Sequence, residues 1–244
     1  MMEQLGHAVK VGFKSTRVLH LAVIGTGTMF AIGSDPWTRL FSILAFTLVA
    51  PLTAGITAGR QADALLTAFG RGRIEWKPMP ELQMLAQDMG VKLNDKKPFG
   101  VTDRNVYAYS NMLTSRVIFE RAFIERLSPD MLKSTAAHEF THIKEGHSNK
   151  VLVIAMPIVM ALAILTFNAP PVVTLVVSIS AIFLLVAIVS RRNEYKADLG
   201  AAKAAGIMPM IETLTLIGKE KGMDRDSDTH PSPRKRIQRL MKLP

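Results

Sequence analysis

Two pairs of long stretches without a charged side chain constrain the fold of this 244-residue chain more than any other feature. The first pair covers Val18–Ser34 and the residues between Arg39 and Arg60, and the second covers Val151–Phe167 and Val172–Ser190. A helix rises about 1.5 Å per residue and needs roughly 20 apolar residues to cross a bilayer core. A very short turn joins the two members of each pair. The sequence therefore predicts four transmembrane helices arranged as two hairpins.

Buried helices of a soluble core are the alternative for these stretches, above all for the two shorter ones. The first stretch is rich in Gly and Thr, and the third contains Pro157. The first stretch also lacks a small-x-small cleavage site, and a second apolar stretch follows it at once. We therefore expect it to remain in the chain as a membrane helix, and not to be a signal peptide.

Basic residues flank these stretches mainly on one side, and the two short turns carry almost no positive charge, with Arg39 at the edge of the first as the exception. The flanking residues precede the first stretch and follow the second and the fourth: Lys10, Lys14, Arg17, Arg60, Arg71, Arg73, Arg191 and Arg192. The positive-inside rule then places both termini and the 60–150 segment in the cytoplasm. The same residues account for much of the net charge of +10 and suit anionic headgroups, so a nucleic-acid partner is not expected.

The segment His138–His142, with the sequence HEFTH, carries the strongest chemical signal. Two histidines four residues apart on a helix lie on one face, so both imidazoles can reach the same metal ion. Glu139 would sit beside that ion and take a proton from a water that the ion activates. Because the chain has no cysteine, metal ligands must come from His, Asp and Glu. The motif indicates a zinc hydrolase site, with a solvated helix that carries these residues by chance as the alternative.

An α+β arrangement is expected around this motif. Glu81–Met89 has apolar residues at helical spacing. Val106–Tyr109 and Arg116–Phe119 are rich in β-prone residues and predict a hairpin. Ser128–Pro129 predicts the start of the helix that carries HEFTH. The strand pair either offers a free edge to an extended peptide or only packs on that helix.

A catalytic zinc site needs a third protein ligand. His147 comes one residue too early for the metzincin spacing, which places Ser148 at that position, so we expect His147 at a helix end or the membrane interface. Glu194 is favoured, because the second hairpin returns the chain to the membrane face that it left, near the end of the HEFTH helix. Asp198, one turn later, could fix the tautomer of a ligand histidine. An ordinary solvated pair of carboxylates is the alternative for Glu194 and Asp198.

Four features of the chain occur together in one known family. They are HEFTH, the apolar hairpin after it, Glu194-x-x-Ala197-Asp198, and Thr229-His230-Pro231 with Arg236. With them the chain resembles the HtpX-type membrane metallopeptidases over roughly its whole length. These enzymes are integral-membrane gluzincins, and the CAAX prenyl proteases are their relatives. The chain is somewhat short for this family.

This resemblance implies a role for each residue of the site. It assigns His138, His142 and Glu194 as the zinc ligands. It assigns Glu139 as the general base and Asp198 as a carboxylate that supports a ligand. It also implies that His230 and Arg236 hold the substrate carbonyl or stabilise the oxyanion. From the residues alone, the basic stretch around Arg236 is more typical of a solvated or headgroup-facing surface.

The expected protein is a mainly α membrane protein of four transmembrane helices with a cytoplasmic α+β zincin-like domain. Residues 1–59 and 151–190 would form the membrane hairpins, 60–150 the catalytic segment, and 191–244 the segment that completes the zinc site. We expect a multi-pass zinc endopeptidase of the cell membrane that cleaves polypeptides at the cytoplasmic face, by resemblance misfolded membrane proteins. A non-catalytic membrane adaptor or sensor is the alternative. An intramembrane protease of the site-2 kind is disfavoured, because charged residues flank HEFTH: Lys133, Lys144 and Glu145.

Overall fold

The computed structural model describes residues 74–103, 107–111, 114–146, 161, 171–227 and 229–243. The chain divides into two compact units, residues 1–69 with 148–186 and residues 70–147 with 187–244. The expected spans 18–34, 39–60 and 151–167 lie outside the described residues, apart from position 161. Among the residues that can be described, no helix combines the length and the apolar character needed to cross a membrane.

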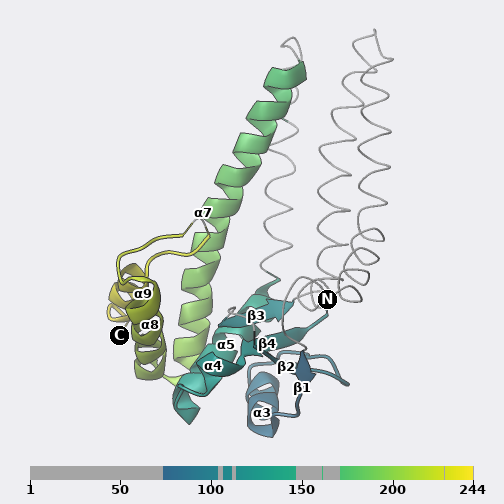
Figure 1. The fold of residues 1–244 in the computed structure, drawn as a ribbon, viewed down its shortest axis with the longest axis vertical. Helices are drawn as coiled ribbons and strands as arrows, with labels where there is room; N and C mark the ends of the chain where they lie inside the picture. The colour runs from purple at the N-terminus through teal and green to yellow at the C-terminus, as the bar shows by residue number, and fades with distance from the viewer. Residues whose placement is uncertain are drawn as a thin grey trace. The chain divides into compact units, whose positions relative to one another are not determined.

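The second unit contains a four-stranded sheet with the strand order β1-β2-β4-β3 (Figure 1). The strands are β1 (Glu75–Trp76), β2 (Phe99–Thr102), β3 (Ala108–Asn111) and β4 (Arg116–Glu120). β4 pairs parallel with β2 and antiparallel with β3, which is an outer strand. The predicted hairpin is therefore confirmed, with its first strand shifted toward Asn111. β1 and β2 were not predicted.

The described helices of the chain are α3 (Pro80–Asp88), α4 (Arg121–Ile124), α5 (Pro129–Glu145), α7 (Pro171–Ala205), α8 (Ile207–Lys221) and α9 (Pro233–Leu240). α3 confirms the predicted helix before the sheet. α5 begins as predicted, because the Ser128 side chain accepts a hydrogen bond from the Met131 backbone N–H at 3.2 Å and Pro129 fills the first turn. α5 ends at Gly146, whose φ of 57° suits a left-handed cap.

α5 is the central helix of this unit, because it is buried on two faces. One face, which includes Phe140, packs on β2, β4 and α3 in a first apolar core. The other face, at Ala137, packs in a second core with Ala201 of α7, Leu214 of α8 and Leu240 of α9. A helix held from both sides offers its remaining face as a rigid platform for side chains.

α5 and α7 approach closely because the residues between them are small. A Cβ added to Gly200 of α7 would lie 2.1 Å from Thr141 Oγ1 and 2.9 Å from Thr141 Cβ. Ala197, three residues before this glycine, and Ala201, the residue after it, are fully buried. Glycine at this point allows the two helix backbones to come together without a clash. The crossing lies between one and two turns of α7 from Glu194, so it fixes the distance of that residue from α5.

Replacing Gly200 with alanine is expected to destabilise the protein by about 1–3 kcal/mol, the usual cost of overpacking a filled core. The same displacement of α7 should weaken zinc binding. Thermal unfolding and zinc titration measure the two effects. In the double variant with Thr141→Ala, which removes the two nearest atoms but keeps Cβ at 2.9 Å, both losses should be partly reversed. If Gly200→Ala alone binds zinc as the wild type does, the crossing does not set the site geometry.

Candidate metal centre

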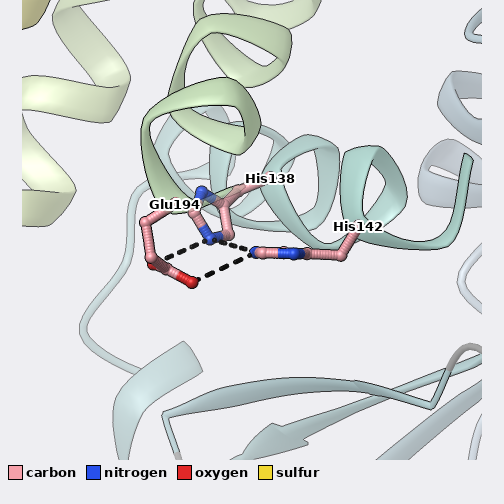
Figure 2. Close-up of side chains that lie close together, drawn as sticks. All are labelled: His138, His142 and Glu194. Carbon is pink, nitrogen blue, oxygen red and sulfur yellow. Dashed lines mark hydrogen bonds and ion pairs between the residues drawn. The ribbon is translucent and has the colours of Figure 1, made fainter. Parts of the chain in front are cut away.

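His138 and His142 lie one turn apart on α5 and turn toward the same point (Figure 2). Their Nε2 atoms are 3.1 Å apart. His138 is buried, because Ala137 and Phe140 on the neighbouring faces of α5 are covered by the two cores. Two ring nitrogens that face each other at this distance could supply two of the ligands of one metal ion.

Glu194 of α7 completes the group. Its Oε1 lies 3.3 Å from His142 Nε2, and its Oε2 lies 3.6 Å from His138 Nε2 (Figure 2). Glu194 is buried at 6% exposure. It is therefore not part of an ordinary solvated pair of surface carboxylates. Within the described part of the chain, these three residues form the group whose donor atoms could hold a metal ion.

The spacing of the donor atoms fits zinc. Ligands at about 2.0–2.2 Å from a tetrahedral zinc ion lie roughly 3.3–3.6 Å from one another. The separation of 3.1 Å between the two Nε2 atoms, and those of 3.3 and 3.6 Å from them to the two oxygens of Glu194, are close to this edge length. Two imidazoles and one carboxylate are also a ligand set of catalytic zinc sites, in which a fourth position stays open.

Asp198 supports the group from behind His138. Its Oδ1 lies 3.0 Å from His138 Nδ1, a short ion-pair contact that is not aligned as a hydrogen bond. Burial alone would raise the pKa of Asp198, but Arg236 and His138 lower it below its ordinary value. The ionised carboxylate favours a proton on Nδ1, which leaves His138 Nε2 free to face Glu194.

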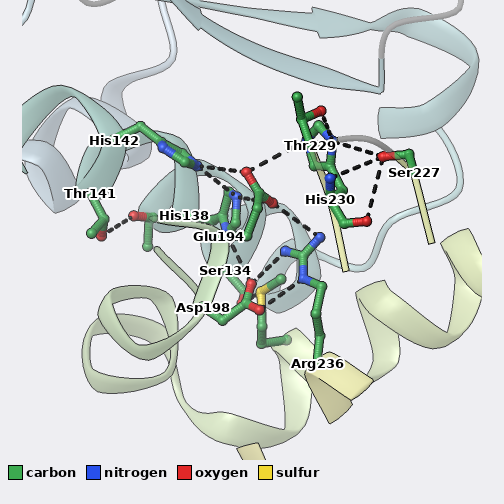
Figure 3. A network of polar contacts seen from close by, with 12 residues as sticks. Ser134, His138, Thr141, His142, Glu194, Asp198, Ser227, Thr229, His230 and Arg236 are labelled. Atoms are coloured by element: carbon green, nitrogen blue, oxygen red, sulfur yellow. Dashed lines mark hydrogen bonds and ion pairs between the residues drawn. The ribbon is translucent and has the colours of Figure 1, made fainter. Parts of the chain in front are cut away.

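Arg236 of α9 connects the two carboxylates of α7 (Figure 3). Its Nε donates to Asp198 Oδ2 at 2.8 Å and its Nη2 donates to Asp198 Oδ1 at 2.5 Å. Its Nη1 lies 3.2 Å from Glu194 Oε2. Such a buried, two-pronged contact is the strongest form of Arg–carboxylate pairing. The expectation from the residues alone, a solvated basic surface, does not hold for Arg236, which is only 8% exposed.

Glu139 lies next to His138 on α5 and is buried at 9% exposure. Burial alone would lower the pKa of Arg236, but the carboxylates around it, among them Glu139, raise that pKa above its ordinary value. The charge of Glu139 therefore acts within the same polar network. It is not a member of the group of donor atoms that could hold a metal.

His230 reaches the same network from the loop before α9 (Figure 3). Its Nε2 lies 3.5 Å from Glu194 Oε1, and its Nδ1 lies 2.8 Å from Thr229 Oγ1. Its side chain is 57% exposed, so it borders the site from the solvent side. His147, the rejected ligand candidate, lies outside the described residues.

Sequence reasoning brought together His138, His142, Glu194 and Asp198, and the structure places them side by side. It did not anticipate the ion pairs between Arg236 and the α7 carboxylates. One signal was available: Arg236, Ile237 and Leu240 share a face of a short helix, and that face is buried or half-buried. An arginine on the buried face of a helix needs a carboxylate partner.

Comparisons with known proteins agree with this geometry. Protease HtpX of Pseudomonas syringae pathovar syringae is 27% identical over 175 residues, 63% of this chain and 59% of that protein. Protease HtpX of Pseudomonas paraeruginosa is 27% identical over 237 residues, 84% of this chain and 81% of that protein. The chain thus spans less than two thirds of the first relative and four fifths of the second.

A solved structure shares the fold. The crystal structure of Ste24p of S. mikatae matches with a TM-score of 0.63 and 16% identity, over 89% of this chain and 65% of that one. The profile of peptidase family M48 matches residues 79–243, which include every residue of the site described above. The resemblance seen in the sequence is therefore confirmed, and the chain belongs to peptidase family M48.

Proposed function

We propose that this protein is a zinc endopeptidase that is held in a membrane and hydrolyses peptide bonds of proteins at the cytoplasmic face. One observation carries the proposal: the Nε2 atoms of His138 and His142, on the helix that also carries Glu139, lie 3.1 Å apart and within 3.3–3.6 Å of the buried Glu194 carboxylate. The family membership supports the peptidase activity, and the names of the relatives support the HtpX type.

His138, His142 and Glu194 would hold the metal. When bound, zinc lowers the pKa of a water molecule toward neutrality and draws charge from the substrate carbonyl. Glu139 accepts a proton from the attacking water as the new C–O bond forms. It then delivers that proton to the amine nitrogen as the C–N bond breaks. His230, at the exposed border of the site, is placed to donate from Nε2 to the substrate oxygen.

Arg236 has a different role in this scheme. Its Nε, Nη1 and Nη2 already face Asp198 and Glu194, and its side chain is buried. We therefore assign it to holding the carboxylates of α7 in place, and assign contact with the substrate to His230. Asp198 holds the ring of His138 in the same way.

The sheet suggests how a substrate binds. β3 is an outer strand and packs against α5, which carries the two histidines. An extended peptide that pairs with an outer strand is held mainly by its backbone, so many sequences can be accepted. Binding of this kind suits an enzyme that removes unfolded segments of proteins. Misfolded membrane proteins are the proposed substrates, in line with the apolar hairpins and the basic flanks of the sequence.

Zinc content and casein cleavage of the detergent-purified full chain test this proposal. We expect a single zinc ion per chain, loss of cleavage when a chelator removes it, and recovery with zinc but not with magnesium. A protein that holds zinc but cleaves no unfolded protein would favour the adaptor function. A protein that takes up no zinc, even when zinc is supplied, would contradict the metal site itself.

A further inference from the structure

The turn that carries His230 is built by hydrogen bonds of its own. The Ser227 backbone N–H donates to the His230 carbonyl at 2.9 Å, and the His230 backbone N–H donates to Ser227 Oγ at 3.0 Å. These two hydrogen bonds connect the first residue of the turn to the last. Thr229 Oγ1, 2.8 Å from His230 Nδ1, fixes one ring nitrogen and leaves Nε2 directed to Glu194 (Figure 3).

Asp226 joins this turn to the start of α9. Its Oδ1 accepts a hydrogen bond from the Ser232 backbone N–H at 2.7 Å, and its Oδ2 accepts one from Lys235 Nζ at 2.5 Å. Asp226 precedes the turn and Ser232 follows it, so one carboxylate spans the segment that contains His230. These hydrogen bonds from Lys235 and Ser232 hold the pKa of Asp226 below its ordinary value.

A second attachment connects the turn to α7. Arg191 Nη2 donates to the Ser227 carbonyl at 3.0 Å. Arg191 lies three residues before Glu194 on the same helix, so the two side chains project from neighbouring positions of one face. The turn is thus fastened both to α9, which carries Arg236, and to the helix that carries Glu194.

These attachments matter because His230 has little else to hold it. Its side chain is more than half exposed, and an exposed side chain loses rotamer freedom when it is fixed. A displacement of about 1 Å at a reacting group can cost roughly a hundredfold in rate. The geometry points to Asp226 as the positioning residue of His230: it fastens to α9 the turn that aims the His230 imidazole at the reaction centre. This inference rests on the proposed peptidase function.

The chain offers a matched control in the same loop. Asp224 pairs with Arg234 Nε at 2.6 Å, also between the loop and α9. Both partners of this pair are exposed, and Asp224 makes none of the contacts that close the turn. Asp224→Ala therefore removes a similar charge and a similar ion pair without releasing His230.

A double-mutant cycle with His230→Ala tests the inference in the full-length, zinc-loaded protein. Asp226→Ala is expected to lower kcat on a casein-derived peptide by about tenfold or more with little change in KM, and Asp224→Ala to have no such effect. Asp226→Asn, which keeps an acceptor for Ser232 but loses the charge, should fall between Asp226→Ala and the wild type. In the His230→Ala background, Asp226→Ala should cause no further loss. Equal losses in both backgrounds would overturn the inference.

A second measurement does not depend on activity. Diethylpyrocarbonate modifies accessible imidazoles, and mass spectrometry gives its rate at His230 in the same samples. We expect a several-fold faster reaction in Asp226→Ala than in the wild type or Asp224→Ala, with unchanged zinc content. An unchanged rate would contradict the positioning role even if the wild type proved inactive as a peptidase. If the wild type proved inactive and His230 still reacted faster in Asp226→Ala than in the wild type, the turn geometry would be supported and the proposed function alone rejected.

Discussion

Replacing Glu139 with glutamine is expected to lower kcat by about 10²–10⁴-fold, the usual contribution of a general acid–base residue. Glutamine keeps the size of the side chain and can still hydrogen bond to water, but it cannot accept the proton. Glu139 is not among the three residues whose donor atoms could hold the metal, so zinc content should stay at the wild-type level. The variant thus separates the chemistry from metal binding.

Cleavage of casein and zinc analysis on one preparation check this result. Asp130→Asn is a suitable control, because Asp130 is an exposed carboxylate in the first turn of the same helix. The control should cleave at the wild-type rate. A Glu139→Gln protein that cleaves equally fast would show that another group takes the proton.

Glu194→Ala is expected to abolish stable zinc binding, and cleavage with it. The variant leaves His138 and His142 as a two-ligand site, and two protein ligands do not make a catalytic zinc site. Replacing a group that only supports a ligand usually costs about 10–100-fold in metal affinity. Asp198→Asn should show a loss of that smaller size, because Asp198 contacts a ligand and not the metal.

Zinc titration of the two variants against wild type measures the difference. Glu212→Ala, at an exposed carboxylate of α8, serves as the control and should bind zinc normally. If Glu194→Ala keeps a full zinc content, the third ligand lies elsewhere and His147 becomes the next residue to test. If Asp198→Asn loses more affinity than Glu194→Ala, the roles of the two carboxylates are exchanged.

Local sequence patterns predicted those parts of the fold that local physics determines. Ser128 and Pro129 specify the start of α5 through hydrogen bonding and a fixed φ angle. Segments rich in β-prone residues indicated β3 and β4, which pair as neighbours in the sequence. β2 escaped prediction because its four residues pair in parallel with β4, and a parallel pair with an intervening strand leaves no local signal.

The site shows the same division. The positions of His138 and His142 follow from helical spacing alone, and Glu194 follows from the order of the apolar stretches. The link from Arg236 to Asp198 joins residues 38 positions apart on different helices, and no spacing rule predicts it. The Thr141–Gly200 contact is equally hidden, because a glycine within a helix does not reveal which side chain approaches it.

The order of the site residues along the chain has a consequence for biosynthesis. The ribosome makes α5 first, and a growing chain that ends before α7 holds two histidines without a carboxylate ligand. Even after Asp198 has been made, 38 more positions must be added before Arg236 can neutralise it. The polar network around the site is therefore complete only after α9, which carries Arg236, has been made and has packed.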